Sequence, residues 1–483
     1  MKFDYISEAD IEKMHEATCE LLIDCGIRVR SQRFIDAAEK IGLSVSKEEN
    51  TDNHLVKFTR EQIEDGIKTA PKKFTMYGLD DKYEINWGDG KAYAQTCVGM
   101  PFIRDIETGE RRNTTIEDEA EYIRVQDALS DIDVISCLTA QGIPEHAANA
   151  IQTACMVKNT TKPLHICIAS YKEVGQVASI LYAAAGGKEK FMAKPFAYLQ
   201  PSPVSPLEYG SGPADATIGI IEEGLPLGII PCPMMGATGP MTLIGSVVQH
   251  NAEMLAGVII AQMMRPGLPV VMSPRVTFMN MSTAMGLWAA PETGLAAAAS
   301  VAMTRHYGIP CEPAGYSCAA KVADTQAGFE SSYNALLLAL METDVIGSAG
   351  ALDNALIASY EKLIIDNEIS SMVKRARRGE IVDDDTMAVD AIKEVMSSGK
   401  RDFLRLKHTR KHLRTELWKP IMSDRSLYAN WSEEALTFEQ RANAAAKKIL
   451  AEHHPDHLSA EQIAQIDAIV EKAIAENPKD QVH

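Results

Sequence analysis

Residues 164–170, LHICIAS, and residues 196–205, FAYLQPSPVS, each join a short apolar, strand-like run to a polar tail. Six further runs have the same form: AYAQTCV (from Ala92), DVISCLTAQG (Asp133), PLGIIPCPMMGATG (Pro226), PVVMSPR (Pro269), IPCEPAGYSC (Ile309) and DVIGSAGALD (Asp344). Most recur at intervals of roughly 30 to 42 residues, the length of a strand, a crossover helix and two loops in a right-handed βαβ unit. Eight such units predict an α/β fold of the (β/α)8 barrel (TIM barrel) type, with its active site at the C-terminal ends of the strands.

The repeat assigns residues 92–355 to the barrel and leaves an extension on each side. Residues 1–91 carry helix signals, such as Ser7 before two acidic residues, and a predicted β-hairpin region from Lys73 that we expect to cover one end of the barrel. Residues 356–483 are helical in pattern and strongly charged. This C-terminal helical extension is predicted to be a cap or a partner-docking element.

Composition limits the classes of partner. The net charge of −18 disfavours nucleic acid and anionic membranes, so we expect a small neutral or cationic ligand. The N-terminus lacks a signal-peptide pattern, and no run of about 18 uncharged apolar residues occurs, which predicts a cytoplasmic protein without a membrane partner. Nine cysteines without a Cys-x-x-Cys pair indicate reduced thiols.

Several crossover helices have recognisable starts. Thr115 is a predicted N-cap, Pro240 and Pro291 are predicted to open two further helices, and Asp324 is a plausible N-cap. Gly308 is expected to end the helix that begins at Pro291. These signals place helices between the strand-like runs, as a βαβ repeat requires.

Cofactor and metal motifs are few. No G-x-G-x-x-G follows a strand, and the only lysine near a strand end is Lys321, which we expect to be solvated rather than to form a Schiff base. His408 and His412 have ligand spacing, but they lie in a basic segment without a third ligand nearby. His165 is the single histidine in a predicted strand, where it is more often a core residue or a hydrogen-bond donor to substrate than a metal ligand. The sequence therefore predicts no bound metal.

Five separate strings resemble the trimethylamine:corrinoid methyltransferase superfamily. They are SPVSPLE (from Ser202), GATGPMTLIGSVVQHNAEMLAG (Gly236), AKVADTQAGFE (Ala320), GALDNALIASYEKLIIDNEI (Gly350) and FLRLKHTRKHLRTELWKP (Phe403). APKKFTMYGLD (Ala70) and PFIRDIETGERR (Pro101) fit it too. The resemblance covers nearly the full length and implies a barrel enzyme that passes a methyl group from a methylated amine to the cobalt of a separate corrinoid (cobalamin-type) protein. It thus implies one-carbon metabolism related to methanogenesis or acetogenesis.

The chain departs from the archaeal trimethylamine enzymes because it contains no pyrrolysine. The region from Ser317 to Lys321 is the expected equivalent of the pyrrolysine position. Members without this residue resemble enzymes that demethylate quaternary amines such as glycine betaine, proline betaine, carnitine or γ-butyrobetaine. A quaternary ammonium already carries its positive charge and leaves as a neutral amine, so no acid, base or metal is needed to activate it.

Site residues follow from this expectation. An aromatic cage would attract the ammonium group through the ring quadrupole, a carboxylate would offset its charge, and polar groups would hold the substrate carboxylate. The cage candidates are Tyr93, Phe278, Trp288 and Tyr316; the carboxylate is Glu208; the polar candidates are Gln95, His165, Gln200 and Arg275. Glu208 could instead lie in the first turn of a helix after Pro206, and Arg275 could pair with an acidic residue.

Two other functions stay open at this point. The chain could be another one-carbon or lyase enzyme on a similar barrel, or a non-catalytic betaine-binding subunit. Small-residue helices also allow close subunit contacts, so we expect a homo-oligomer.

Overall fold

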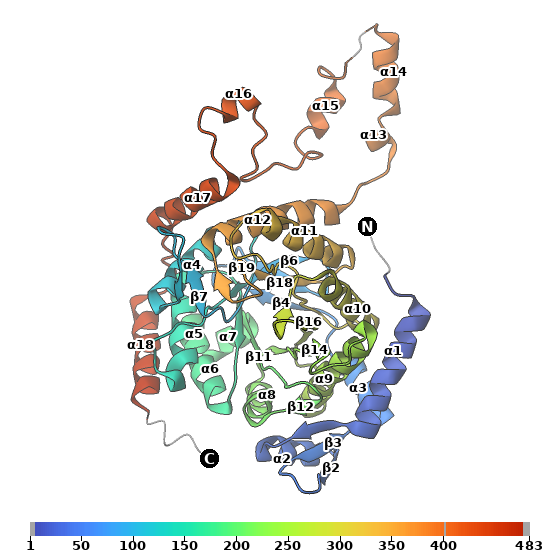
Figure 1. Cartoon of the computed structure of the whole chain (residues 1–483), viewed down its shortest axis with the longest axis vertical. Helices are drawn as coiled ribbons and strands as arrows, with labels where there is room; N and C mark the ends of the chain where they lie inside the picture. Colours follow the sequence, from blue (N-terminus) through green and yellow to red (C-terminus); the bar gives the residue numbers. More distant parts are fainter. Residues whose placement is uncertain (1–4, 400–401, 477–483) are drawn as a thin grey trace.

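The computed structural model describes residues 5–399 and 402–476, which form an α/β fold with parallel strands at its centre (Figure 1). Five of these strands form one sheet in the order β15-β13-β11-β10-β9, and two more form the pair β18-β6. The strands are β6 (Tyr93–Thr96), β9 (Ile135–Ser136), β10 (Leu164–Cys167), β11 (Ala197–Gln200), β13 (Leu227–Ile229), β15 (Val270–Met272) and β18 (Val345–Ala349). Each lies in one of the predicted runs.

The run from Ile309 forms isolated parallel bridges instead of a named strand. Cys311 bridges Met272 at the end of β15, and Ala314 bridges Gly347 of β18. A further parallel bridge joins Gln95 of β6 to Val134, which precedes β9. The seventh run thus lies between β15 and β18, and β6 lies beside the start of β9.

Helices surround the central strands (Figure 1). They are α4 (Ile116–Ala128), α5 (Ala148–Asn159), α6 (Tyr171–Ala185), α7 (Lys188–Ala193), α8 (Ser211–Glu223), α9 (Leu243–Met264), α10 (Pro291–Tyr307), α11 (Thr325–Leu340) and α12 (Tyr360–Arg378), with the short 3-10 helix η2 (Glu145–Ala147) before α5. Among the described residues only α9 is long and apolar enough to cross a membrane, and 78% of its apolar window is buried inside the protein. Burial in the core accounts for its composition.

The helix signals are confirmed with one exception. The Thr115 side chain accepts from the backbone N–H of Asp118, Pro291 is in the first turn of α10, and Gly308 ends that helix with φ +65°. Asp324 accepts from the N–H of Ala327 and caps α11. Pro240 was expected to open α9, but this was wrong: Thr242 is the N-cap, and the residues before it stay in a loop.

A β-hairpin closes one end of the central strands. It consists of β4 (Phe74–Tyr77) and β5 (Glu84–Trp87), which pair antiparallel. Trp87 packs with residues near the starts of the strands, including Val134, Val271 and Val345. The expected cover over one end is thus present, and it lies at the N-terminal ends of the strands.

The N-terminal extension contains a sheet that the sequence analysis did not predict. Its order is β12-β1-β3-β2, and β1 pairs in parallel with β12, which follows β11 in the chain. The elements are α1 (Glu8–Glu20), the π-helix η1 (Leu21–Cys25), β1 (Ile27–Val29), α2 (Gln32–Lys40), β2 (Ser44–Lys47), β3 (His54–Lys57), α3 (Arg60–Thr69) and β12 (Glu208–Tyr209). Short strands such as SVSK have little apolar alternation, so their pairing depends on distant partners.

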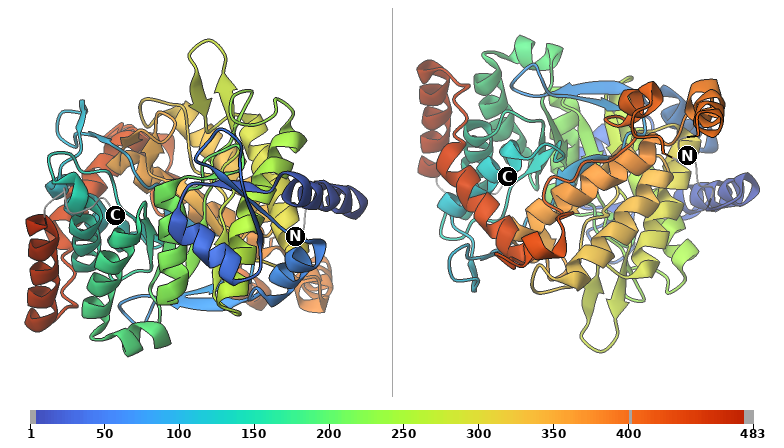
Figure 2. Two further views of the ribbon diagram at one scale, coloured as in Figure 1. Left: turned by 90° about the horizontal axis from the view of Figure 1, so that it is seen from below. Right: turned by 90° about the horizontal axis from the view of Figure 1, so that it is seen from above.

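Further short strands follow the C-terminal ends of the central ones. They are β7 (Phe102–Arg104), β8 (Arg111–Asn113), β19 (Ala351–Leu352) and β20 (Ile357–Ala358) in one sheet, and β14 (Met234–Met235), β16 (Thr277–Asn280) and β17 (Met285–Leu287) in another. Figure 2 shows the β16–β17 hairpin projecting from the body of the molecule.

The C-terminal region leaves the body and then returns to it. Residues 380–399 and 402–431, which we call the C-terminal arm, contain α13 (Asp384–Met387), α14 (Val389–Ser397), α15 (Lys407–His412) and α16 (Tyr428–Trp431). Most of these elements extend away from the body (Figure 1), but the segment between α15 and α16 touches α12, where Glu368 accepts from the backbone N–H groups of Ile421 and Met422. Helix α17 (Phe438–Glu452) then packs on α12 and α4, and α18 (Ala460–Ala475) packs on α5 and α6.

Candidate functional site

A buried polar network crosses the interior of the central strands. His165 of β10 lies at its centre: its Nε2 is 2.6 Å from Oε1 of Gln200, and its Nδ1 is 2.9 Å from Oγ of Ser136 and 3.2 Å from Nε2 of Gln95. The hydroxyl of Tyr198 donates to Oε1 of Gln95 at 2.7 Å. These side chains come from four neighbouring strands, β6, β9, β10 and β11. Residues two apart on a strand, such as Tyr198 and Gln200, share a face, so all of the groups point to the same place.

The hydrogen bonds define the state of the histidine. Oε1 of Gln200 is an acceptor, so Nε2 of His165 carries the proton and Nδ1 accepts from Nε2 of Gln95, while the Ser136 hydroxyl donates to the carbonyl oxygen of Thr96. Burial lowers the pKa of His165 to about 3. His165 is therefore a neutral orienting group and not a proton donor in general acid catalysis at neutral pH.

An ion pair extends this network. Nη2 of Arg275 donates to Oε1 of Glu312, and Nη1 of Arg275 donates to the Glu312 carbonyl oxygen at 2.6 Å. Nε2 of Gln95 donates to the same carboxylate oxygen at 3.1 Å. The other oxygen, Oε2 of Glu312, is buried and has no hydrogen-bond partner within the described residues. The alternative in which Arg275 pairs with an acidic residue is thereby confirmed.

Two glycines make room for these side chains. A Cβ atom on Gly347 would lie 2.1 Å from Oε1 of Glu312 and 2.9 Å from Nη2 of Arg275. A Cβ atom on Gly228 would lie 2.9 Å from Nε2 of Gln200. Both glycines are on central strands, where a missing side chain permits close approach.

Thiols adjoin the network on the side of the strand C-terminal ends. Cys167 lies two residues after His165, and its Sγ is 3.8 Å from Nε2 of the histidine. Burial raises the pKa of Cys97 and of Cys167 to about 12. Both groups are therefore thiols at neutral pH and poor nucleophiles. All described cysteines are free, which confirms the prediction of reduced thiols.

Two of the predicted cage residues lie on the hairpin beyond the strand ends. Phe278 is on β16, and Trp288 directly follows β17 with its backbone N–H 3.2 Å from Oδ1 of Asn354. Both side chains are half-buried. Within the part of the chain that the structure describes, neither ring has an aromatic or cationic partner, and Phe278 packs against the main hydrophobic core.

The other predicted site residues lie elsewhere. Tyr93 begins β6 beside the hairpin cover, and Tyr316 is buried in the core, where its carbonyl accepts from Lys362 of α12. Glu208 is on β12, with Oε1 3.8 Å from Nε of Arg30. The alternative that put Glu208 in the first turn of a helix is wrong, because α8 begins only at Ser211.

Sequence reasoning missed four members of the network. They are Glu312, Ser273, Tyr198 and Ser136, and Ser273 joins the network by accepting a hydrogen bond from Nε2 of Gln200. The available signal was the period of two along each strand: Ser136 is two residues after Val134, and Ser273 is two after Val271, both of which contact the hairpin cover. The composition of the strand-like runs did not show that these polar side chains point into the interior.

The region expected to correspond to the pyrrolysine position is a loop after the seventh run. Ser317 is buried, whereas Lys321 is exposed and its Nζ is 3.0 Å from Oδ1 of Asp353. An exposed, ion-paired lysine agrees with the expectation of a solvated side chain and not with a Schiff base.

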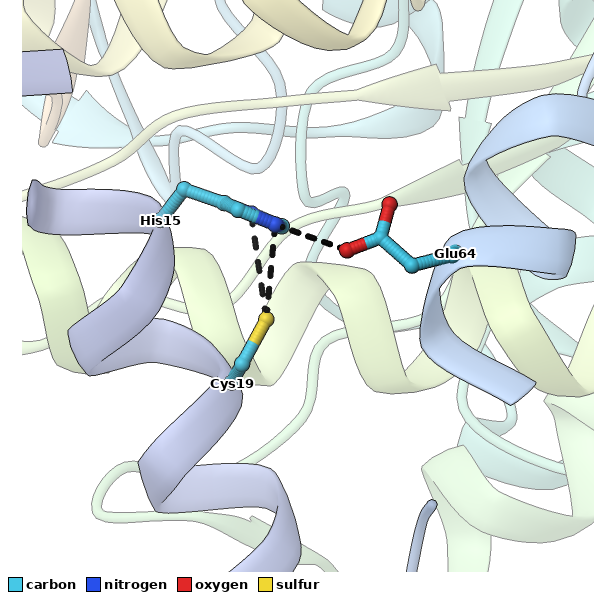
Figure 3. A group of neighbouring side chains, drawn as sticks. All are labelled: His15, Cys19 and Glu64. Atoms are coloured by element: carbon cyan, nitrogen blue, oxygen red, sulfur yellow. Dashed lines mark hydrogen bonds and ion pairs between the residues drawn. The ribbon is translucent and has the colours of Figure 1, made fainter. Parts of the chain in front are cut away.

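Among the residues that the structure describes, two groups of side chains lie close enough to share a metal ion. One is His15, Cys19 and Glu64, drawn in Figure 3, and the other is Asp385, His408 and His412. In the first, Nε2 of His15 is 3.0 Å from Oε1 of Glu64, and Arg60 pairs with the same oxygen at 2.9 Å.

Positive charges oppose a cation in both groups. Arg60 lies beside Glu64, and Lys411 pairs with Asp385 at 2.6 Å. Neither group is at the ends of the central strands. The absence of a metal from the site stays a prediction.

Comparison with known proteins gives the class of the protein. A family model described as trimethylamine methyltransferase (MTTB) matches residues 1–478. The chain belongs to this family of methyltransferases, which confirms the resemblance seen in its motifs.

Particular relatives span the full length. A glycine betaine methyltransferase from Desulfitobacterium hafniense is 31% identical over 99% of this chain and 98% of that protein. Trimethylamine methyltransferases MttB from Desulfitobacterium hafniense and Methanosarcina barkeri are each 30% identical over 96% of this chain, and over 93% and 94% of those proteins.

Solved structures agree on the fold. The monomethylamine methyltransferase MtmB of Methanosarcina barkeri matches with a TM-score of 0.58 at 13% identity, over 98% of this chain and 88% of that one. A hydroxylamine complex of MtmB gives a TM-score of 0.57 at 14% identity, over 98% and 89%.

Proposed function

We propose that the central strands close into a (β/α)8 barrel that catalyses methyl transfer from a quaternary amine. The closure is supported by the parallel bridges on both sides of the run from Ile309 and by the Gln95 to Val134 bridge, which together join the two parallel sheets. The observation that carries the choice of substrate is the buried polar network, which contains a neutral histidine and one carboxylate oxygen, Oε2 of Glu312, without a hydrogen-bond partner among the described residues.

The network is suited to a cationic substrate that needs no proton transfer. His165 is neutral at physiological pH, and Cys97 and Cys167 stay protonated. A fixed ammonium charge beside Oε2 of Glu312 would compensate the charge of this buried oxygen electrostatically, without a hydrogen bond, because a quaternary nitrogen has no N–H. The full-length similarity to a glycine betaine methyltransferase favours a betaine among quaternary amines.

The reaction needs positioning more than activation. The methyl acceptor is the Co(I) centre of a corrinoid protein, which acts as a second substrate and supplies the electron pair of the new bond to carbon. The electrons of the broken C–N bond stay on nitrogen, so the product amine is neutral. This chain would align the methyl group and exclude water, a form of catalysis that depends on orientation.

Residue roles follow from where the side chains lie. Trp288 and Phe278 would face the ammonium group from the hairpin, and Glu312 would offset its charge in place of Glu208. Gln95, His165, Gln200 and Arg275 would orient the substrate, directly or by fixing Glu312. Tyr93 and Tyr316 would act in packing, because Tyr93 packs in the apolar cluster under the hairpin cover and Tyr316 is buried in the core.

The proposal also includes the location, the partner protein and the assembly of the enzyme. It would work in the cytoplasm with a cognate corrinoid protein, without a bound metal of its own, and as a homo-oligomer. The domain limits 1–91, 92–355 and 356–483 would describe its extensions and barrel, although α12 packs beside α11 around the central strands.

A direct assay tests the function. The protein is mixed anaerobically with Co(I) cobalamin and, one at a time, glycine betaine, proline betaine, carnitine, γ-butyrobetaine and trimethylamine. We expect methylcobalamin absorbance and the demethylated amine by mass spectrometry with at least one quaternary amine, and neither with trimethylamine. Binding of a betaine without transfer would favour a binding subunit, and a cleaved carbon skeleton would favour a lyase; either result would overturn the proposal.

A further inference from the structure

Helix α11 presents an apolar stripe to solvent. Phe329, Tyr333 and Leu336 are spaced four and three residues apart, so they share one face of the helix. They are 60%, 48% and 40% exposed. The opposite face of α11 packs on the body, where Ala335 and Leu338 are buried. A continuous row of large apolar side chains on a core helix is typical of an interaction surface.

The C-terminal arm also exposes large apolar side chains to solvent. The side chains of Val382, Met396, Leu404 and Tyr428 are 80%, 78%, 79% and 79% exposed. The helices of the arm have few buried residues: Val395 is the one fully buried side chain in α13, α14, α15 and α16 as described. One copy of the chain therefore leaves these large apolar side chains of its arm in water.

Charge indicates which surface the arm fits. Residues 403–419 contain six Lys or Arg residues against one Glu, in a chain whose net charge is −18. Of these six cations, only Lys411 has an ion pair among the described residues. Helix α11 has no Lys or Arg and carries Glu330, with Asp324 at its N-cap. The basic segment 403–419 of the arm and an apolar helix without positive charge are complementary.

The two surfaces lie on the same side of the molecule. Figure 1 shows the arm rising from the side on which α11 and α12 lie, and the view from above in Figure 2 shows these helices on the face toward the arm. If a second copy is related by a two-fold axis on this side, each arm can reach the α11 stripe of the other copy. Both contacts then form at once, and the assembly is closed.

We propose that the chain forms a two-fold dimer in which the C-terminal arm of each copy packs on the α11 stripe of the other. The exchange buries Phe329, Tyr333 and Leu336 under the apolar side chains of the partner's arm and places the basic segment near an acidic subunit. This inference concerns assembly and does not depend on the identity of the methyl donor.

Two variants test the α11 stripe and the C-terminal arm independently. Phe329→Glu disables the stripe and leaves the arm intact; Met396→Glu with Leu404→Glu disables the arm and leaves the stripe intact. Ile463→Glu on α18, which is 38% exposed on another face, is the matched control. By sedimentation velocity we expect the wild type and Ile463→Glu to be dimers or multiples of dimers. Each surface variant should dissociate at least tenfold more readily, with an unchanged circular dichroism spectrum.

A mixing experiment tests the exchange itself. When the two surface variants are combined, a mixed dimer has one contact with both surfaces intact, so exchange predicts that dimer reappears. If the arm instead folds onto α11 of its own chain, each variant is damaged alone and mixing restores nothing. A monomeric wild type, surface variants that dimerise as well as the wild type, or no recovery on mixing would each overturn the proposal.

Discussion

Arg275 and Glu312 form an ion pair in the interior of the central strands, with side chains that are 8% and 0% exposed. The two residues come from adjacent runs of the repeat, one just after β15 and the other in the run from Ile309. Burial raises the pKa of the Glu312 carboxyl, and the neighbouring guanidinium opposes that rise. The pair is thus an electrostatic unit that depends on both partners.

Removing one partner should therefore be costly. Glu312→Gln leaves the Arg275 charge buried and unpaired, and we expect a loss of about 3–5 kcal/mol in the free energy of unfolding. Urea denaturation measures it. Replacing both residues, as in Arg275→Met with Glu312→Met, should cost less than the sum of the single changes; full additivity would contradict a coupled pair.

The space beside the Arg275–Glu312 ion pair is too small for an added side chain at position 347. Gly347→Ala places a Cβ atom 2.1 Å from Oε1 of Glu312, so the pair must shift. We expect a destabilisation of about 1–3 kcal/mol and a lower rate of methyl transfer. Gly175→Ala in α6 is the control, because nothing lies within 4 Å of its Cβ position and alanine should stabilise the helix by about 0.5–1 kcal/mol.

The neutral state of His165 predicts the pH profile. Its pKa of about 3 lies far below the working range, so the histidine should not titrate between pH 5 and 9. The methyl-transfer rates of the wild type and of His165→Gln should then differ in size but share the same pH dependence. An ionisation near pH 6.5 that is present in the wild type and lost in the variant would contradict this assignment.

Glu119 should make stability depend on pH. Burial raises its pKa to about 8, above the usual value of 4.5, and its Oε2 accepts from Gln152 at 3.0 Å. A raised pKa means that the folded state holds the proton more tightly, so the stabilisation is complete below about pH 4.5 and is lost as the pH rises through 8.

Glu119→Gln keeps the site uncharged at every pH. The stability of the wild type relative to this variant should fall between pH 5 and 9 by several kcal/mol, at about 1.4 kcal/mol for each unit of pKa shift. Thermal unfolding of both proteins across this range measures the difference. Parallel curves for the two proteins would show that Glu119 ionises normally.

Substitutions of Trp288 test whether its ring contacts the ammonium group of the substrate. Trp288→Ala should raise the KM or Kd for the quaternary amine about 2- to 30-fold, as expected for a cation–π contact of about 0.5–2 kcal/mol. The rate with Co(I) cobalamin at saturating amine should change much less. Trp288→Phe keeps a ring face and should recover most of the affinity; unchanged affinity in the alanine variant would remove Trp288 from the site.

The sequence predicted the parts of the fold that depend on local periodicity. Apolar runs located the parallel strands, and caps such as Thr115 and Asp324 located helix starts, because both signals arise within a few residues. The pairing of β1 with β12 could not be predicted in this way, since its partners are far apart in the chain and neither strand has a strong pattern of its own.

The candidate site was only partly predictable for a similar reason. Gln95, His165, Gln200 and Arg275 were selected as polar residues of strand runs, and the structure brings them into one network. Glu208 and Tyr316 have suitable chemistry but lie in other layers, because a polar or aromatic residue after a strand can point to the helices or to another sheet.

By itself, the sequence determined the repeating strand and helix units, the reduced thiols and the membership of the methyltransferase family, because each is expressed in local pattern or in motifs. Only the tertiary structure decided that Glu312 is the carboxylate beside Arg275 and that His165 is neutral. Both properties come from burial and from neighbours on separate strands, and these are fixed only when the strands come together.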